Sequence, residues 1–264
     1  MLRDMTNVVD DKSFTQGTIF NCAYCASYPN SETLGLIITA RCDIANKDKV
    51  KFFNYIPAIP FETWKNKDLL PLIRKKIYKN LLSQYITLFS KAGFSKANLE
   101  AYGFDRIYSV ILSNKKLNTK EIAKLTTIKD RIDCLEGNST YKKLHSTFQD
   151  DIKIVLDEII ENKNSDYFFI DSITGYNSVI VNLREIYELD ISTAKKIPTG
   201  IDLNYTKFHS GLNLNIDNKF CSIVGQLKSP FIELLIQRFT NNFIRIGVSN
   251  PHNDLSTVIM EIKK

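Results

Sequence analysis

Strand-like patterns of apolar residues fill the first quarter of the chain. Residues 18–24 and 50–56 are rich in β-branched and aromatic side chains, and the run 34–40 is almost wholly apolar. Such a run is typical of a strand that is buried on both faces of a sheet. We expect Pro57 and Pro60 to end this strand region, because proline cannot donate a hydrogen bond to a sheet.

Near Lys67 the spacing of apolar residues changes to that of an amphipathic helix. The apolar stripe of this first helix consists of Leu69, Leu72, Ile73, Ile77, Leu81, Leu82, Tyr85 and Ile86. Further helices are predicted over residues 99–112, over 120–134 after an Asn118–Thr119 cap, and from Ser139 through Ile160. The middle of the chain is therefore predicted to be a group of helices.

Strand character returns at residue 166 and is followed by one more helix. Residues 166–183 predict a hairpin, and residues 220–227 predict a last strand. Ser229 followed by Pro230 is a favoured helix start, here for residues 231–243. Three early strands alone would make a marginal sheet, so we expect the later strands to complete it. The run from Leu34 to Ala40 should then share a sheet with residues between Tyr167 and Leu183.

Composition places the chain among globular proteins. The 264 residues are 44% hydrophobic and 24% charged, which excludes wholesale disorder. No apolar stretch approaches the ~18 residues that cross a membrane, and the first residues lack the apolar core of a secretory signal. Five cysteines, an odd number, favour reduced thiols and a cytoplasmic location. Abundant lysine, asparagine and isoleucine favour a bacterial source.

Positive charge is concentrated in the predicted helices. The net charge is +6, but residues 65–129 hold 14 lysines and arginines against 4 acidic residues. Such a segment either contacts phosphates or forms an ordinary solvated helix surface. Trp64 either stacks on a base or packs between helices and sheet. The candidate phosphate contacts are Arg74, Lys75, Lys76 and Lys79.

Short segments of the two β regions resemble the MazF/PemK toxins in order and spacing. The segments are Gln16–Ile19, Leu34–Thr39, Asp43–Asn46, Phe53–Pro57 and Val179–Leu189, within roughly 80 of the 264 residues. The resemblance implies a discontinuous SH3-like β-barrel. Family members cut single-stranded RNA with a basic residue at a loop-to-strand junction and a nearby hydroxyl. That junction here reads Thr33-Leu34-Gly35 and lacks the arginine, so the catalytic candidates of a nuclease are Thr39, Arg41 and Asp43.

A second resemblance concerns residues 37–43 and 229–247. The two segments together are similar to a pair of segments in uncharacterised bacterial proteins that are encoded near mobile elements or phage-defence genes. This resemblance implies a cellular setting and no particular reaction. Together the patterns and resemblances predict an α+β fold. We expect a discontinuous SH3-like β-barrel with a C-terminal helix in residues 13–62 and 164–264, whose strands end near residue 228. A basic helical insertion at 63–163 interrupts it.

Cysteines provide two further alternatives. Cys22 and Cys25 form a C-x-x-C pair at a strand end, where odd spacing points the thiols to opposite faces, so we favour buried packing over zinc binding. Cys42 follows the most apolar strand and is either a nucleophile with a histidine base or a packed side chain. Together with Arg41 and Asp43, it is a candidate recognition site.

The C-terminal helix carries polar residues on one face. Glu233, Gln237 and Asn241 are spaced at four-residue intervals. Arg238 and Arg245, seven residues apart, share a face and require acidic partners if buried, for which Glu233 or Asp171 would serve. This set is either an internal network that fastens the helix or the lining of a binding cleft.

We therefore expect a non-enzymatic cytosolic interaction protein, a subunit or regulator of a bacterial phage-defence or toxin-type system. A protein partner from the same operon is favoured, with nucleic acid as the other partner and a MazF-like endoribonuclease or a metal or thiol enzyme at Cys42 as alternatives. The chain has no phosphate loop or zinc-protease motif, and we expect no cofactor, metal or membrane. The predicted binding residues are Arg41, Cys42, Asp43, Arg74, Lys75, Lys76, Lys79, Glu233, Gln237, Arg238 and Arg245.

Overall fold

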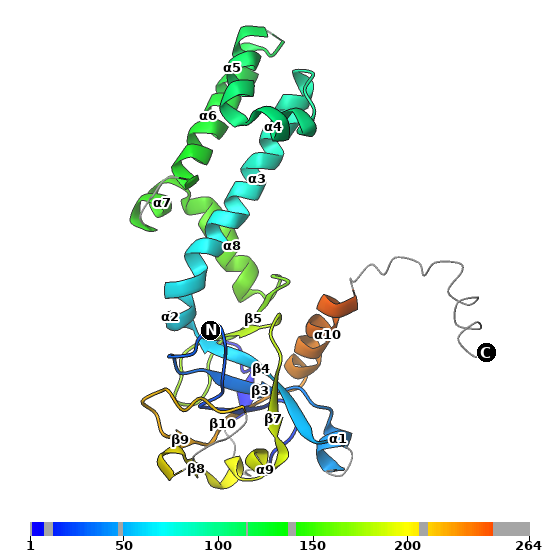
Figure 1. Ribbon diagram of the computed structural model, residues 1–264, viewed down its shortest axis with the longest axis vertical. Helices are drawn as coiled ribbons and strands as arrows, with labels where there is room; N and C mark the ends of the chain where they lie inside the picture. The colour runs from blue at the N-terminus through cyan, green and yellow to red at the C-terminus, as the bar shows by residue number, and fades with distance from the viewer. Residues whose placement is uncertain are drawn as a thin grey trace, which may run out of the picture. The chain divides into compact units, whose positions relative to one another are not determined.

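The computed structural model describes residues 2–7, 13–46, 50–114, 116–136, 141–205 and 211–244 (Figure 1). The chain divides into two compact units. The sheet unit comprises Met1–Ala58, Ser165–Phe168 and Val181–Lys264, and the helical unit comprises Ile59–Asn164 and Phe169–Ile180. Among the helices in the described ranges, none is both long and apolar enough to cross a membrane.

The predicted fold class is confirmed: an antiparallel sheet, discontinuous in sequence and curled into a half-barrel, is interrupted by a helical insertion and followed by a C-terminal helix. The strands are β1 (Thr6–Asn7), β2 (Thr18–Phe20), β3 (Leu34–Ile37), β4 (Phe52–Pro60), β5 (Tyr167–Ile170), β6 (Val179–Asn182), β7 (Tyr187–Asp190) and β10 (Ile223–Leu227). Their order is β1-β10-β2-β3-β4-β6-β5, with β7 also paired to β4. The sheet therefore contains both β3 and the later hairpin, with β4 between them, as expected because three early strands alone would be marginal.

Two local features favour the curl of the sheet. The register between β10 and β2 shifts between Ile223 and Gly225, and such a bulge bends a strand and increases its twist. On the neighbouring pair, Gly35 of β3 lies opposite Phe20 of β2. The Phe20 ring occupies the place where a side chain at position 35 would lie, so only glycine fits there.

The prediction that Pro57 ends a strand is wrong. β4 continues through Pro57 to Pro60, with Pro57 opposite Gly35. Ile38 N donates to Asn54 O, which marks residues 38 and 54 as a hydrogen-bonded position of this antiparallel ladder. Such positions alternate along the ladder, so Gly35 and Pro57 lie opposite each other at a position without hydrogen bonds between them. An N–H at position 57 is therefore not needed for pairing with β3.

Short elements complete the sheet unit. They are α1 (Arg41–Ala45), α9 (Ile191–Ala194), the 3₁₀ turns Ile197–Thr199 and Leu203–Tyr205, the two-stranded β8 (Ile201–Asp202) and β9 (Phe220–Cys221), and α10 (Phe231–Ile244). The helix α10 begins just after Pro230, as predicted, and buries Ile232, Leu235 and Phe239. Asn242 Nδ2 donates to Ser165 O at 3.1 Å, which fastens the C-terminal half of this helix to the sheet unit.

The helical unit is built around α3, which packs against α6 and α8 (Figure 1). Its helices are α2 (Phe61–Trp64), a π-helical turn (Lys65–Leu69), α3 (Leu70–Lys91), α4 (Lys96–Tyr102), α5 (Phe104–Asn114), α6 (Thr119–Glu136), α7 (Tyr141–Thr147) and α8 (Gln149–Ile160). Asn118 caps α6 as predicted, since its Oδ1 accepts from Glu121 N at 2.9 Å. The single helix predicted up to Ile160 is wrong, because Phe148, at φ −128°, separates α7 from α8. Its predicted start, Ser139–Thr140, lies outside the described residues.

Candidate binding site

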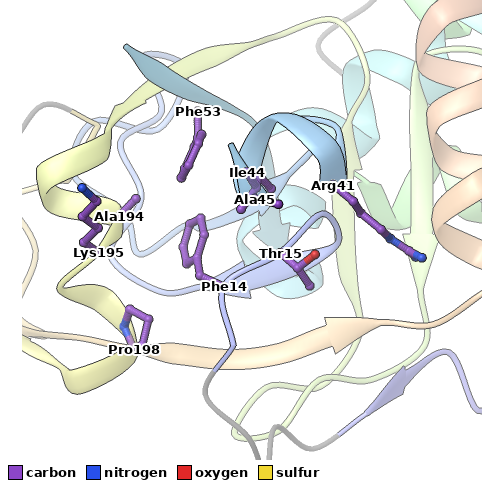
Figure 2. Close-up of a pocket in the computed structure, with 9 residues that line it drawn as sticks. All are labelled: Phe14, Thr15, Arg41, Ile44, Ala45, Phe53, Ala194, Lys195 and Pro198. Carbon is purple, nitrogen blue, oxygen red and sulfur yellow. The ribbon is translucent and has the colours of Figure 1, made fainter. Parts of the chain in front are cut away.

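The sheet unit contains a pocket of about 440 Å³ (Figure 2). This volume lies in the range of small-molecule and side-chain binding sites. Four separate segments supply the walls: the residues before β2, helix α1, strand β4 and the region of α9. The lining residues are Phe14, Thr15, Arg41, Ile44, Ala45, Phe53, Ala194, Lys195 and Pro198.

Two phenylalanines form the apolar centre of the pocket. The rings of Phe14 and Phe53 lie next to each other in Figure 2, with centroids 5.7 Å apart and planes inclined by 23°. Phe53 comes from β4 and is only 3% exposed, whereas Phe14 is half-buried. Pairing of β4 with β7 holds Phe53 opposite Leu189. The pocket floor is therefore anchored in the sheet, and Phe14 covers part of it.

Helix α1 supplies a second wall. It begins at Arg41, where the chain turns after β3, and Asp43 N and Ile44 N both donate to Ala40 O. Ile44 is 6% exposed and anchors the short helix in the core, which leaves Ala45 exposed at the pocket. The arrangement presents a small residue at an accessible position of the wall.

Hydrogen-bond donors stand at the rim of the pocket. Figure 2 shows Lys195 on one side of the two rings and Thr15 and Arg41 on the other, with the Arg41 side chain directed away from the rings. Lys195 directly follows α9, whose N-cap Asp190 accepts from Thr193 N at 3.3 Å. Arg41 Nη2 lies 3.9 Å from Glu233 Oε1, but both side chains are more than half exposed, so this ion pair is weak.

The nuclease candidates do not form a catalytic group among the described residues. Thr39 is 9% exposed, and its Oγ1 accepts from Asn54 N at 2.6 Å, so the hydroxyl is committed to the backbone. Arg41 and Asp43 lie two positions apart on α1. Cys42 is exposed, with its Sγ 3.7 Å from Asp43 Oδ1. Within the described part of the sheet unit there is no histidine to act as a base for either a hydroxyl or a thiol.

The C-x-x-C pair is buried, as expected from its position. Cys22 and Cys25 are both free thiols with no exposed surface. Burial, together with the nearby Glu185 carboxylate, raises the pKa of Cys25 to about 11, so this thiol stays protonated at neutral pH. In the described ranges no three histidine, cysteine or acidic residues gather in a way that could hold a metal ion.

A polar cluster around Glu185 escaped the sequence analysis. The Glu185 carboxylate accepts from Ser27 Oγ at 2.5 Å, from Asn182 Nδ2 at 2.7 Å and from Tyr187 OH. Tyr187 OH in turn accepts from Ala26 N at 2.9 Å. These bonds join the loop after β2 to the turn between β6 and β7, so the cluster fastens the sheet unit. The spacing Asn182-x-x-Glu185-x-Tyr187 is the one local signal that could have indicated it.

The four basic candidates of α3 differ in their surroundings. Lys76 Nζ pairs with Glu158 on α8, Arg74 is half-buried, and Lys75 and Lys79 are exposed. The excess of charge predicted for residues 65–129 is reduced by acids from residues 130–161. The whole helical unit holds 19 lysines and arginines against 14 aspartates and glutamates, a net +5, which leaves +1 for the sheet unit. The four residues therefore do not form a uniformly cationic face.

The predicted network on α10 is met only in part. Glu233, Gln237 and Asn241 are exposed on one face as predicted, and Glu233 approaches Arg41. Arg238 is half-buried, and burial lowers the pKa of its guanidinium. Arg245 lies outside the described residues. The structure therefore brings Arg41 and Glu233 together, while Phe14, Phe53 and Lys195 are pocket residues that the sequence analysis missed.

Comparison of the chain with protein-family models, with curated proteins and with solved structures gave no match.

Proposed function

We propose that the chain is a non-enzymatic interaction protein, and that it binds a protein partner through the pocket between Phe14, Phe53 and α1. In this proposal it acts in the bacterial cytoplasm as a subunit or regulator of a phage-defence or toxin-type system, with a partner from the same operon. The observation that carries the proposal is the pocket itself: an apolar centre with cations at its rim, in the unit that carries Arg41.

Binding is favoured over catalysis by the state of the candidate groups. Cleavage of RNA requires a base, an acid and a cation placed around one phosphate. The Thr39 hydroxyl is engaged by Asn54 N, and Arg41 points away from the pocket centre. An interaction site needs only an apolar centre with a polar rim, which is the arrangement of these nine lining residues.

A matched pair of substitutions tests the proposal. Ala45 lines the pocket and Ala97 lies on α4; both are exposed in short helices. The tagged chain is co-expressed with its neighbouring gene products and purified. Ala45→Trp should fill the pocket and reduce recovery of the partner at least tenfold, whereas Ala97→Trp should leave recovery unchanged. Equal recovery from both variants would overturn the proposal.

The same preparations address the nuclease alternative. Purified protein incubated with single-stranded RNA should leave the RNA intact. If RNA is cleaved and Arg41→Ala abolishes the cleavage, the MazF-like endoribonuclease becomes the better account and the interaction proposal fails as the main function.

A further inference from the structure

The charged residues that line the pocket are all of one sign. Six of its lining residues are apolar, Thr15 carries a hydroxyl, and the two ionic side chains are Arg41 and Lys195. No aspartate or glutamate is among these nine described residues. The weak contact of Arg41 with exposed Glu233 leaves most of its charge available to a ligand.

The positions of these cations constrain what could cover the pocket. Lys195 and Arg41 lie on opposite sides of the Phe14–Phe53 pair in Figure 2. A ligand group placed against the rings therefore has Lys195 on one flank and, on the other, Arg41, whose side chain is directed away from the rings in this structure. The complementary ligand carries an apolar group at its centre and negative charge on both sides.

We infer that the pocket takes an acidic peptide segment of the partner, in which one aromatic or branched aliphatic side chain packs against Phe14 and Phe53 between flanking carboxylates. This inference rests on the proposed function and names the chemistry of the partner. The carboxylate on one side contacts Lys195. The carboxylate on the other side contacts Arg41, drawing it from Glu233.

A single-stranded nucleic acid fits the same pocket less well. Successive bases of a strand stack on successive aromatic side chains, but only two of the nine lining residues, Phe14 and Phe53, are aromatic. Tracking a phosphate backbone also needs a row of cations. The sheet unit has a net charge of only +1, and its Arg184 and Lys228 are paired with Asp166 and Asp4.

Short peptides test the inference on the full chain. The probe is capped Asp-Asp-Phe-Asp-Asp, with Asn-Asn-Phe-Asn-Asn and Asp-Asp-Ala-Asp-Asp as controls that remove the charge or the ring. Binding is followed by the NMR shifts of Ala45 and Ala194 at peptide concentrations around 1 mM, the range suited to weak ligands. We expect the acidic phenylalanine peptide to bind at least tenfold more tightly than either control, and more weakly as salt is raised.

Neighbouring lysines provide the matched variants. Lys195 and Lys196 are both exposed, but only Lys195 lines the pocket. Lys195→Glu should weaken the acidic peptide at least tenfold, and Lys196→Glu by no more than about threefold, as expected for a general change of surface charge.

Three outcomes would overturn the inference. They are equal binding of the charged and uncharged phenylalanine peptides, tighter binding of hexauridylate than of the acidic peptide, and equal effects of the two lysine variants. If any of these occurs while Ala45→Trp still blocks partner recovery, the ligand chemistry is wrong and the proposed function stands. If Ala45→Trp has no effect on recovery, the proposed function itself has failed.

Discussion

The longest hydrogen bonds of the sheet unit span more of the sequence than those of the helical unit. In the sheet unit, Thr18 Oγ1 donates to Gln226 Oε1 and Asn21 Nδ2 donates to Phe220 O, bonds that span 208 and 199 residues of sequence. In the helical unit, α6 is capped by its own neighbours, and Lys96–Glu100 is an ion pair within one helix. The site formed by long-range contacts is therefore the one that local sequence patterns could not reveal.

The two units also differ in how their charged side chains are paired. The helical unit has the larger net charge, +5, yet Lys76, Lys91 and Lys129 each lie against carboxylates. The sheet unit has a net charge of only +1, but its pocket is lined by two cations and no acid. Net charge along a sequence therefore indicates less about binding than the placement of each charge relative to its neighbours.

The largest effect is expected from loss of a long-range contact in the sheet core. Phe20 has no exposed surface and meets the Tyr55 ring edge-on, with centroids 5.4 Å apart. Phe20→Ala should lower the free energy of unfolding by about 3–5 kcal/mol in urea titrations. Tyr205→Ala, at an 89% exposed position, should change it by less than about 0.5 kcal/mol. A loss below about 1 kcal/mol for Phe20→Ala would contradict the assigned core.

Two buried tyrosines, one in each unit, sharpen the comparison. Tyr55 OH donates to Tyr24 O at 2.8 Å and reaches Gly211 O at 3.0 Å, so Tyr55→Phe should cost about 1–3 kcal/mol in urea unfolding. Tyr85 is equally buried, but its hydroxyl has no hydrogen-bond partner among the described residues. Tyr85→Phe should therefore be neutral or slightly stabilising. Equal losses of unfolding free energy in Tyr55→Phe and Tyr85→Phe would contradict this difference in hydrogen bonding.

The buried Tyr85 hydroxyl should also make the free energy of unfolding depend on alkaline pH, by a smaller amount. Burial raises the pKa of Tyr85 from 10.0 to about 12, so the unfolded chain releases this proton at lower pH than the folded one. Stability should fall as pH rises from 10 towards 12. Half a pH unit above 10, Tyr85→Phe should reduce this loss by under about 1 kcal/mol in urea unfolding. Identical pH profiles for wild type and variant would contradict this.

The smallest effect is expected at the ion pair of the helical unit. Lys76 and Glu158 are each about one-third exposed, at 37% and 34%. Lys76→Gln should cost under about 1 kcal/mol, and the cost should shrink in high salt because exposed pairs are screened. Lys79→Gln, at an exposed position on the same helix, is the control for the change of side chain alone. A larger, salt-independent loss at Lys76 would indicate a structural role.

Most of the fold could be predicted from the spacing of apolar residues and from the residues that begin helices and form turns. The apolar run at Leu34 and the Ser229–Pro230 helix start both predict elements that the structure contains, because these signals are local. The prediction at Pro57 is wrong because a proline is tolerated inside a strand where pairing with one neighbour, here β3, needs no N–H, and this register depends on the partner strand. The prediction of one long helix through Phe148 is wrong because the apolar periodicity continues across the break.

The candidate site could be predicted only at Arg41. Phe14, Phe53 and Lys195 lie far apart in sequence and meet because β4 pairs with β7, which places α9 near the residues before β2. No local pattern carries this information, since each residue alone is an ordinary aromatic or surface lysine. Thr39 is the opposite case. Its position near Arg41 and Asp43 predicts a catalytic role, but its hydroxyl accepts a hydrogen bond from a backbone N–H.

The central claim is that the pocket at α1 is the surface that binds the partner. The most direct test is calorimetric titration of the purified partner into the Ala45→Trp and Ala97→Trp variants of the full chain. The account predicts at least a tenfold loss of affinity, about 1.4 kcal/mol, for Ala45→Trp and no change for Ala97→Trp. Wild-type affinity in both variants would contradict it.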